Sequence, residues 1–188
     1  MKKILLVALM VMSTAAFAGS KGYTTVELSD ETNRVTDADS VKLGLVVGFK
    51  AEDKMDYSLK LENSQAEVGN GSISTGIEAR VRKGFTLGAT TPYIGVRLGE
   101  KISSSANFAH FAFDYGVKFP IVGPLSGDVG GRYRNAFDTT NAFQSNRGHV
   151  TVALALTDKD SVAVRYSKAY GDDGEAKNAI RLSYSRSF

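Results

Sequence analysis

The last eleven residues of the sequence, Asn178–Phe188, read NAIRLSYSRSF. Apolar side chains stand at Ile180, Leu182, Tyr184 and Phe188, and arginine and serine occupy most positions between them. Successive side chains of a β-strand point to opposite faces of a sheet, so this alternation predicts a strand with one apolar and one polar face. Chain ends are usually polar and frayed, whereas this segment ends on a large aromatic residue. We therefore expect it to be paired on both sides and to lie against an apolar medium.

The N-terminal segment predicts how the chain reaches that medium. Two lysines after Met1 are followed by ILLVALMVM and then by STAAFA. A basic start, an apolar stretch of roughly ten residues and small residues at Ala16 and Ala18 are typical of a secretory signal peptide. The apolar stretch is shorter than the roughly 20 residues that a spanning helix needs, which argues against an uncleaved anchor. We expect residues 1–18 to be a cleaved signal peptide and residues 19–188 to form one domain.

Composition sets further bounds on the class of protein. Loss of the two signal-peptide lysines lowers the formal net charge from +3 to +1, so the charge does not indicate a nucleic-acid partner. The chain has no cysteine, so no disulfide stabilises it. A mean hydropathy of −0.14 suits a soluble protein, but it also suits a transmembrane barrel, in which every second side chain can be polar.

Alternation recurs along the whole chain, in about ten segments. Val41–Lys50 carries apolar side chains at odd positions, and so does Phe111–Phe119. The connections between segments also alternate in length, with longer polar loops expected around DETNRVTDADS, NSQAEVGNG, EKISSSAN, NAFDTTNAFQSN and GDDGEAK and short turns at KAEDK, PIVGP and TDKD. One connection, RKGFTLGATT, is long where a short one is expected, so eight or twelve strands remain open.

The alternating final strand after a signal peptide resembles the outer-membrane β-barrel proteins of Gram-negative bacteria. The resemblance implies an all-β fold, a single antiparallel up-and-down transmembrane β-barrel of about ten strands in the bacterial outer membrane, in contact with lipid and lipopolysaccharide. It also implies that Phe188, Tyr184, Leu182 and Ile180 form the signal read by the barrel-assembly machinery. Arg186 departs from the pattern at one outward position. A soluble β-sandwich or lipocalin-like barrel, with its apolar face inside, is the alternative fold.

Aromatic side chains near strand ends are expected to form girdles at the two membrane interfaces. The candidates are Tyr23, Phe49, Tyr57, Phe119, Tyr166 and Phe188.

Strand parity predicts that one face of the barrel wall, the lumen, is strongly basic. The candidate solute-binding residues are Arg80, Arg82, Arg97, Lys118, Arg132, Arg134, Arg165 and Arg181, with Lys42 and Lys60 on the same face and Glu27, Asp56, Glu62, Glu78 and Asp114 as the acids. Arginine binds carboxylate and phosphate through a planar fork, so the excess of cations favours anions. We therefore expect a narrow porin-like channel for passive passage of small anionic solutes. An arginine-lined lumen is similar to that of porins specific for acidic oligosaccharides.

Two other functions stay open. In small barrels resembling OmpA and OmpX the inward charges pair and plug the lumen, which gives a structural or surface-interaction role. The third is an outer-membrane lipid-modifying enzyme, with His149 and Thr151 of HVT, or His110 and Asp114, as candidates. The sequence has no GxSxG, HExxH or cysteine, so we expect no enzyme activity. We likewise expect no cofactor and no metal, since GDDGEAK lacks the ligand spacing of an EF-hand loop.

Overall fold

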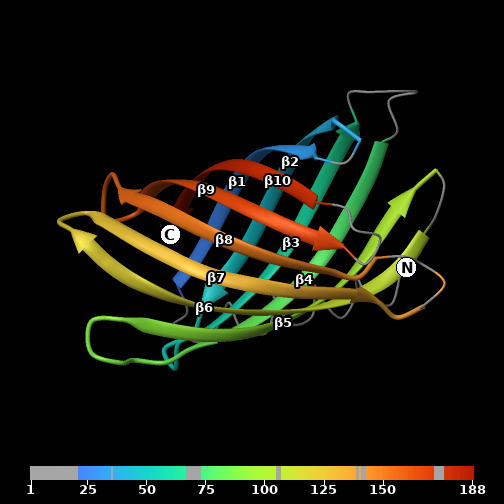
Figure 1. Cartoon of the computed structure of the whole chain (residues 1–188). Coiled ribbons are helices and arrows are strands. Elements are labelled where there is room, and N and C mark those ends of the chain that lie inside the picture. Colours follow the sequence, from blue (N-terminus) through green and yellow to red (C-terminus); the bar gives the residue numbers. More distant parts are fainter. Residues whose placement is uncertain are drawn as a thin grey trace.

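The computed structural model describes residues 21–34, 36–66, 73–104, 107–138, 140, 143–171 and 176–188, and the predicted signal peptide lies outside them. The described residues form one closed barrel of ten antiparallel strands (Figure 1). The strands are β1 Lys21–Asn33, β2 Ala38–Lys50, β3 Met55–Ala66, β4 Ile73–Gly84, β5 Thr91–Ser103, β6 Asn107–Val122, β7 Leu125–Ala136, β8 Ser145–Ala155, β9 Asp160–Gly171 and β10 Ala176–Ser187. The predicted all-β fold of about ten strands is confirmed. No helix in the described part of the chain is long and apolar enough to cross a membrane.

The final strand closes the barrel, as its sequence predicts. β10 pairs with β9 on one side and with β1 on the other, in a register that runs from Tyr23 opposite Ser187 to Asn33 opposite Lys177 (Figure 1). Each strand therefore has two neighbours and no edge remains. Within a bilayer an unpaired backbone N–H or C=O costs several kcal/mol, so closure is what allows a sheet to span it.

The two faces of the barrel wall have opposite chemistry. Large apolar side chains lie on the outside and are exposed, among them Leu43, Val96 and Ile180. The buried side chains of the inner face include charged ones such as Arg97 and Asp114. A soluble barrel has the reverse arrangement, so the alternative of a sandwich or lipocalin-like fold is wrong. The apolar outer surface is that of a barrel that spans a membrane.

The connections fall at two ends of the barrel, which we call the loop side and the turn side. The loop side holds the connections 34–37, 67–72, 104–106, 137–144 and 172–175, and the turn side holds 51–54, 85–90, 123–124 and 156–159. The predicted extents of the longer loops are wrong, because the strands continue into them. For example, the stretch from 30 to 40 is mostly strand, with only four connecting residues. A backbone ladder needs no apolar side chain, so pairing persists where the hydrophobic pattern stops.

The connection RKGFTLGATT does not hide two further strands. β4 runs to Gly84 and β5 starts at Thr91, and Leu87 and Thr90 form an isolated bridge within the turn between them. The eight-strand and twelve-strand alternatives are therefore wrong.

Two predictions about individual side chains need comment. Tyr23 does not join an outer girdle, because its strand parity is that of Glu27, and it points inward to donate a 2.7 Å hydrogen bond to Asp56. Arg186 does lie outward, as the sequence pattern requires, but at the turn-side rim, where it is 62% exposed and pairs with Asp160 at 3.5 Å. An arginine at the rim keeps its charge in water, so it costs far less than one at mid-membrane.

Candidate functional site

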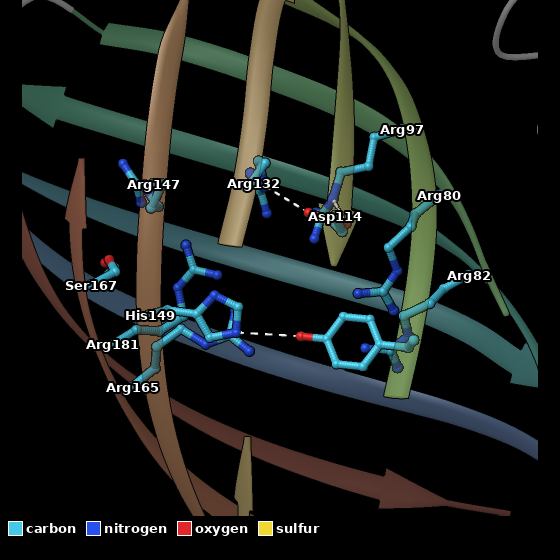
Figure 2. Close-up of a pocket in the computed structure, with 12 residues that line it drawn as sticks. Arg80, Arg82, Arg97, Asp114, Arg132, Arg147, His149, Arg165, Ser167 and Arg181 are labelled. Carbon is cyan, nitrogen blue, oxygen red and sulfur yellow. Dashed lines mark hydrogen bonds and ion pairs between the residues drawn. The ribbon is translucent and has the colours of Figure 1, made fainter. Parts of the chain in front are cut away.

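The lumen consists of two wide ends joined by a narrow middle. The loop-side vestibule has a volume of about 440 Å³ and is lined by residues that include Lys42, Arg134 and Phe143. The turn-side vestibule has a volume of about 290 Å³, and Tyr23 and Lys118 are among its lining residues. Between them, the waist contains two small cavities of about 50 and 30 Å³. Figure 2 shows the smaller of these two cavities, ringed by arginines that come from several strands.

All eight predicted solute-binding residues lie on the lumen face. Arg80, Arg82, Arg97, Arg132, Arg165 and Arg181 line the 30 Å³ cavity of the waist (Figure 2). Arg134 lines the loop-side vestibule and Lys118 the turn-side vestibule. Strand parity brings these side chains together because each strand contributes every second residue to the same enclosed space.

Acidic side chains lie between the arginines of the waist. Asp114 accepts from Nε of Arg97 at 2.5 Å with one carboxylate oxygen and from Nε of Arg132 at 3.0 Å with the other (Figure 2 shows the second contact). Arg97 also donates to Glu78 at 3.0 Å, and Glu78 lies 3.2 Å from His110. These five side chains form one continuous network across β4, β5, β6 and β7.

The other lumen acids contact basic side chains in the same way. Their partners are Arg80 and Arg82 for Asp56, Lys60 and Arg181 for Glu27 and Glu62, Lys42 and Arg147 for Glu31, and His149 and Arg165 for Asp128. Each of these carboxylates is thus matched with two basic groups. These contacts hold the cationic side chains in place along the lumen.

Several arginines face one another directly across neighbouring strands. The register places Arg80 opposite Arg97, Arg132 opposite Arg147 and Arg165 opposite Arg181. Like charges directly opposite each other destabilise a sheet, so the acids between them offset a real repulsion. The three pairs concentrate positive charge on the inner face of the barrel.

The lumen carries about twice as many cations as acids. Within the described residues, the strand residues that line these cavities include seven acids and fourteen lysines and arginines: Glu27, Glu31, Asp56, Glu62, Glu78, Asp114 and Asp128 against Lys42, Lys50, Lys60, Arg80, Arg82, Arg97, Lys101, Lys118, Arg132, Arg134, Arg147, Arg165, Lys177 and Arg181. Because the acids can neutralise only about half of these cations, the interior of the lumen is positive.

Sequence reasoning missed part of this set. Glu31 and Arg147 pair with each other at 2.8 Å although they lie 116 residues apart. Glu31 belongs to a stretch that was expected to be a polar loop, and Arg147 lies between an expected loop and the strand expected after it. Asp128 was missed for a different reason. It has the same parity as Arg132 on β7, so the alternation in that weakly patterned strand contains the signal that would have placed it inward.

The two candidate histidines contact partners other than those considered in the sequence analysis. His149 contacts Asp128 at 3.3 Å and lies 3.4 Å from the Tyr93 hydroxyl, while the Thr151 hydroxyl accepts a hydrogen bond from Arg165 at 2.8 Å. His110 is bound to Glu78 rather than to Asp114. Among the described residues, no group of acids and histidines is arranged to hold a metal ion.

Comparison with known proteins gives matches in structure only. No protein-family model matches the chain, and no curated protein sequence matches it. An outer-membrane channel from Pseudomonas putida F1 is similar with a TM-score of 0.57 and 10% identity, over 91% of this chain and 96% of that one. The translocator domain of the autotransporter NalP from Neisseria meningitidis gives 0.53 and 9%, over 98% and 95%. The KdgM porin, solved in complex with disordered oligogalacturonate, gives 0.51 and 9%, over 87% and 99%.

At identities this low, the structural similarity establishes the fold and leaves the function open. The different roles of these proteins illustrate this. The predicted resemblance is confirmed at that level. Together with the apolar outer surface, it shows that the chain is a membrane-spanning barrel with the fold of the bacterial outer-membrane β-barrels.

Proposed function

We propose that the barrel is a narrow channel for passive passage of small anions across the outer membrane. The observation that carries the proposal is the two-to-one excess of cations over acids along a lumen with a vestibule at each end. A positively charged, poorly screened path attracts anions and repels cations. The three facing arginine pairs favour the same function, since an anion passing between them relieves their mutual repulsion.

The waist limits the size of the solute. One water needs a cavity in which about 10–15 Å³ is open to the centre of a water molecule. The cavities of 30 and 50 Å³ therefore hold only a few waters each. Chloride and other small anions match this scale better than a sugar ring does. The porin and channel named above support a channel role, but the acidic oligosaccharide in the KdgM complex is larger than the waist of this chain in its described conformation.

Planar-bilayer recording of the purified barrel tests the proposal. In a potassium chloride gradient, the reversal potential should show a preference for chloride. Replacing Arg80, Arg97 and Arg132 with serine should weaken this preference and raise the conductance. Arg186→Ser is the matched control, because it removes one arginine at the outer rim and should change neither quantity. A preference of the wild-type barrel for potassium would contradict the proposal.

The second candidate is a structural barrel with a charge-plugged lumen. It is favoured by the small cavities of the waist and by the pairing of every lumen acid named above. The same recordings distinguish the two functions. If the wild-type barrel does not conduct and the triple serine variant does, the arginines act as a plug.

A further inference from the structure

Arg134 differs from the other seven lumen arginines in its partner. Each of the others lies within 4.0 Å of an acid: Arg80, Arg82, Arg97, Arg132, Arg147, Arg165 and Arg181. Arg134 has no ion pair within the described part of the chain. Its guanidinium carbon lies instead 3.7 Å from the centre of the Phe143 ring. Phe143 belongs to the β7–β8 connection, so a residue outside the strands covers an arginine inside the lumen.

Phe143 is itself held in place by several contacts. Its ring packs edge-on against Phe108 at 4.6 Å and lies 5.1 Å from the ring of His110. The Lys101 ammonium lies 5.7 Å from the ring centre. The ring therefore has a defined position at the loop-side vestibule, and the stacked guanidinium is oriented with it. An aromatic ring on the face of a guanidinium leaves the edge, with its N–H donors, for another ligand.

Buried nitrogen atoms beside Phe143 also lack partners. Nε of Arg134 and Nδ1 of His110 are both buried without a hydrogen-bond partner in the part of the chain that the structure describes. Nε of an arginine is always a donor. Buried donors are rarely left unsatisfied in native proteins, and an exception points to an ion or water that completes the site.

We propose that Arg134, oriented by Phe143, is a binding site for a small oxyanion, a carboxylate or a phosphate group, that enters the loop-side vestibule. The oxyanion accepts hydrogen bonds from the edge of the guanidinium, including Nε. The vestibule volume of about 440 Å³ leaves room for such a group. Glu31, Glu62 and Glu78 also line the vestibule. All three are engaged by cations: Glu31 by Lys42 and Arg147, Glu62 by Lys60, and Glu78 by Arg97.

The site adds a binding step to the proposed function. It rests on that function in one respect, because the channel is the route by which the anion arrives. A solute from the loop side would meet Arg134 before it reaches the waist. Binding itself needs no passage, so it can be measured separately from conduction.

Isothermal titration of the folded, full-length mature barrel in detergent micelles tests the site. The probes are inorganic phosphate, acetate and chloride, all at the same ionic strength. Phosphate and acetate should bind the wild-type barrel more tightly than chloride, since two oxygens of an oxyanion accept in parallel from two N–H donors of the fork. Arg134→Gln should weaken phosphate binding roughly tenfold to a hundredfold, the range expected for hydrogen bonds to charged groups. Arg186→Gln is the matched control and should leave binding unchanged.

Two further variants separate charge from orientation. Arg134→Lys keeps the charge and loses the fork, so it should bind phosphate more weakly than the wild type and lose its preference over chloride. Phe143→Leu keeps an apolar side chain but loses the ring, so it should weaken binding a few-fold. Heat modifiability on gels verifies that each variant is folded, and Arg134→Lys serves if Arg134→Gln does not fold.

The outcomes keep the two proposals distinct. Phosphate binding that depends on Arg134 in a barrel that does not conduct would support the site and overturn the channel. Anion-selective conduction without Arg134-dependent binding would support the channel and overturn the site. The site is also overturned if the wild-type barrel binds no phosphate, or if chloride binds as well as phosphate.

Discussion

The strongest stability prediction concerns Asp114, which joins two arginines of the waist. Its carboxylate lies 2.5 Å from Nε of Arg97 and 3.0 Å from Nε of Arg132, and its side chain is only 9% exposed. Among the described residues, Asp114 is the acid that pairs with Arg132, whereas Arg97 also has Glu78. The variant Asp114→Asn therefore leaves Arg132 as a nearly buried charge without an acidic partner.

The size of the effect follows from this geometry. Two unit charges about 4 Å apart attract by roughly 4 kcal/mol at an effective dielectric constant of about 20. Removing one partner of a buried pair costs about 3–5 kcal/mol, because the other charge stays buried. The few waters that the neighbouring cavity can hold solvate Arg132 in part, so we expect Asp114→Asn to lower the free energy of unfolding by about 3 kcal/mol.

Urea titration of the barrel refolded in lipid vesicles, followed by heat modifiability on gels, measures this loss. Asp53→Asn is the matched control, since it makes the same chemical change in an exposed turn, where Asp53 pairs with Lys83 at 3.1 Å. That variant should unfold at the wild-type urea concentration. The double variant Asp114→Asn with Arg132→Gln should recover part of the stability, because it removes the unpaired charge as well. Equal unfolding midpoints for Asp114→Asn and Asp53→Asn would refute the reasoning.

Three further predictions concern topology, assembly and export. Protease added to intact cells should cut the β7–β8 connection, residues 137–144, and spare the turn at Lys50–Lys54; cleavage only at the turn would reverse the proposed topology. Deletion of Phe188 should lower the yield of heat-modifiable barrel but not export, because its N–H donates to the carbonyl of Gly22 at 3.0 Å and its ring covers that glycine. Gly22→Val should lower the yield too, since a Cβ there would lie 2.5 Å from the ring, and normal yields in both variants would dismiss this contact. Mass spectrometry of the exported protein should find Gly19 at the N-terminus, and a retained signal segment would contradict the predicted cleavage.

Most of the fold was predictable from the sequence because strand alternation is a local property. A period of two assigns each side chain to a face without knowledge of its neighbours, so Arg80 and Arg165 could be assigned to the lumen face and Ile180 to the lipid face. The apolar final strand with Phe188 similarly predicted closure against another strand. Alternation fails where both faces are polar, which is why the ends of β1 and β2 were expected to be loop.

Contacts across the lumen could not be predicted in this way. The pairing of Glu31 with Arg147, and the position of Phe143 over Arg134, depend on the number of strands, on their register and on the path of a connection. These are properties of the closed barrel as a whole, and a one-residue change of register would exchange the faces of a strand. The sequence by itself determined a membrane barrel with a basic lumen, since a local two-residue period carries that information. Only the tertiary structure decided which charges meet and how narrow the waist is, because those distances are set by side chains from many strands converging in one enclosed space.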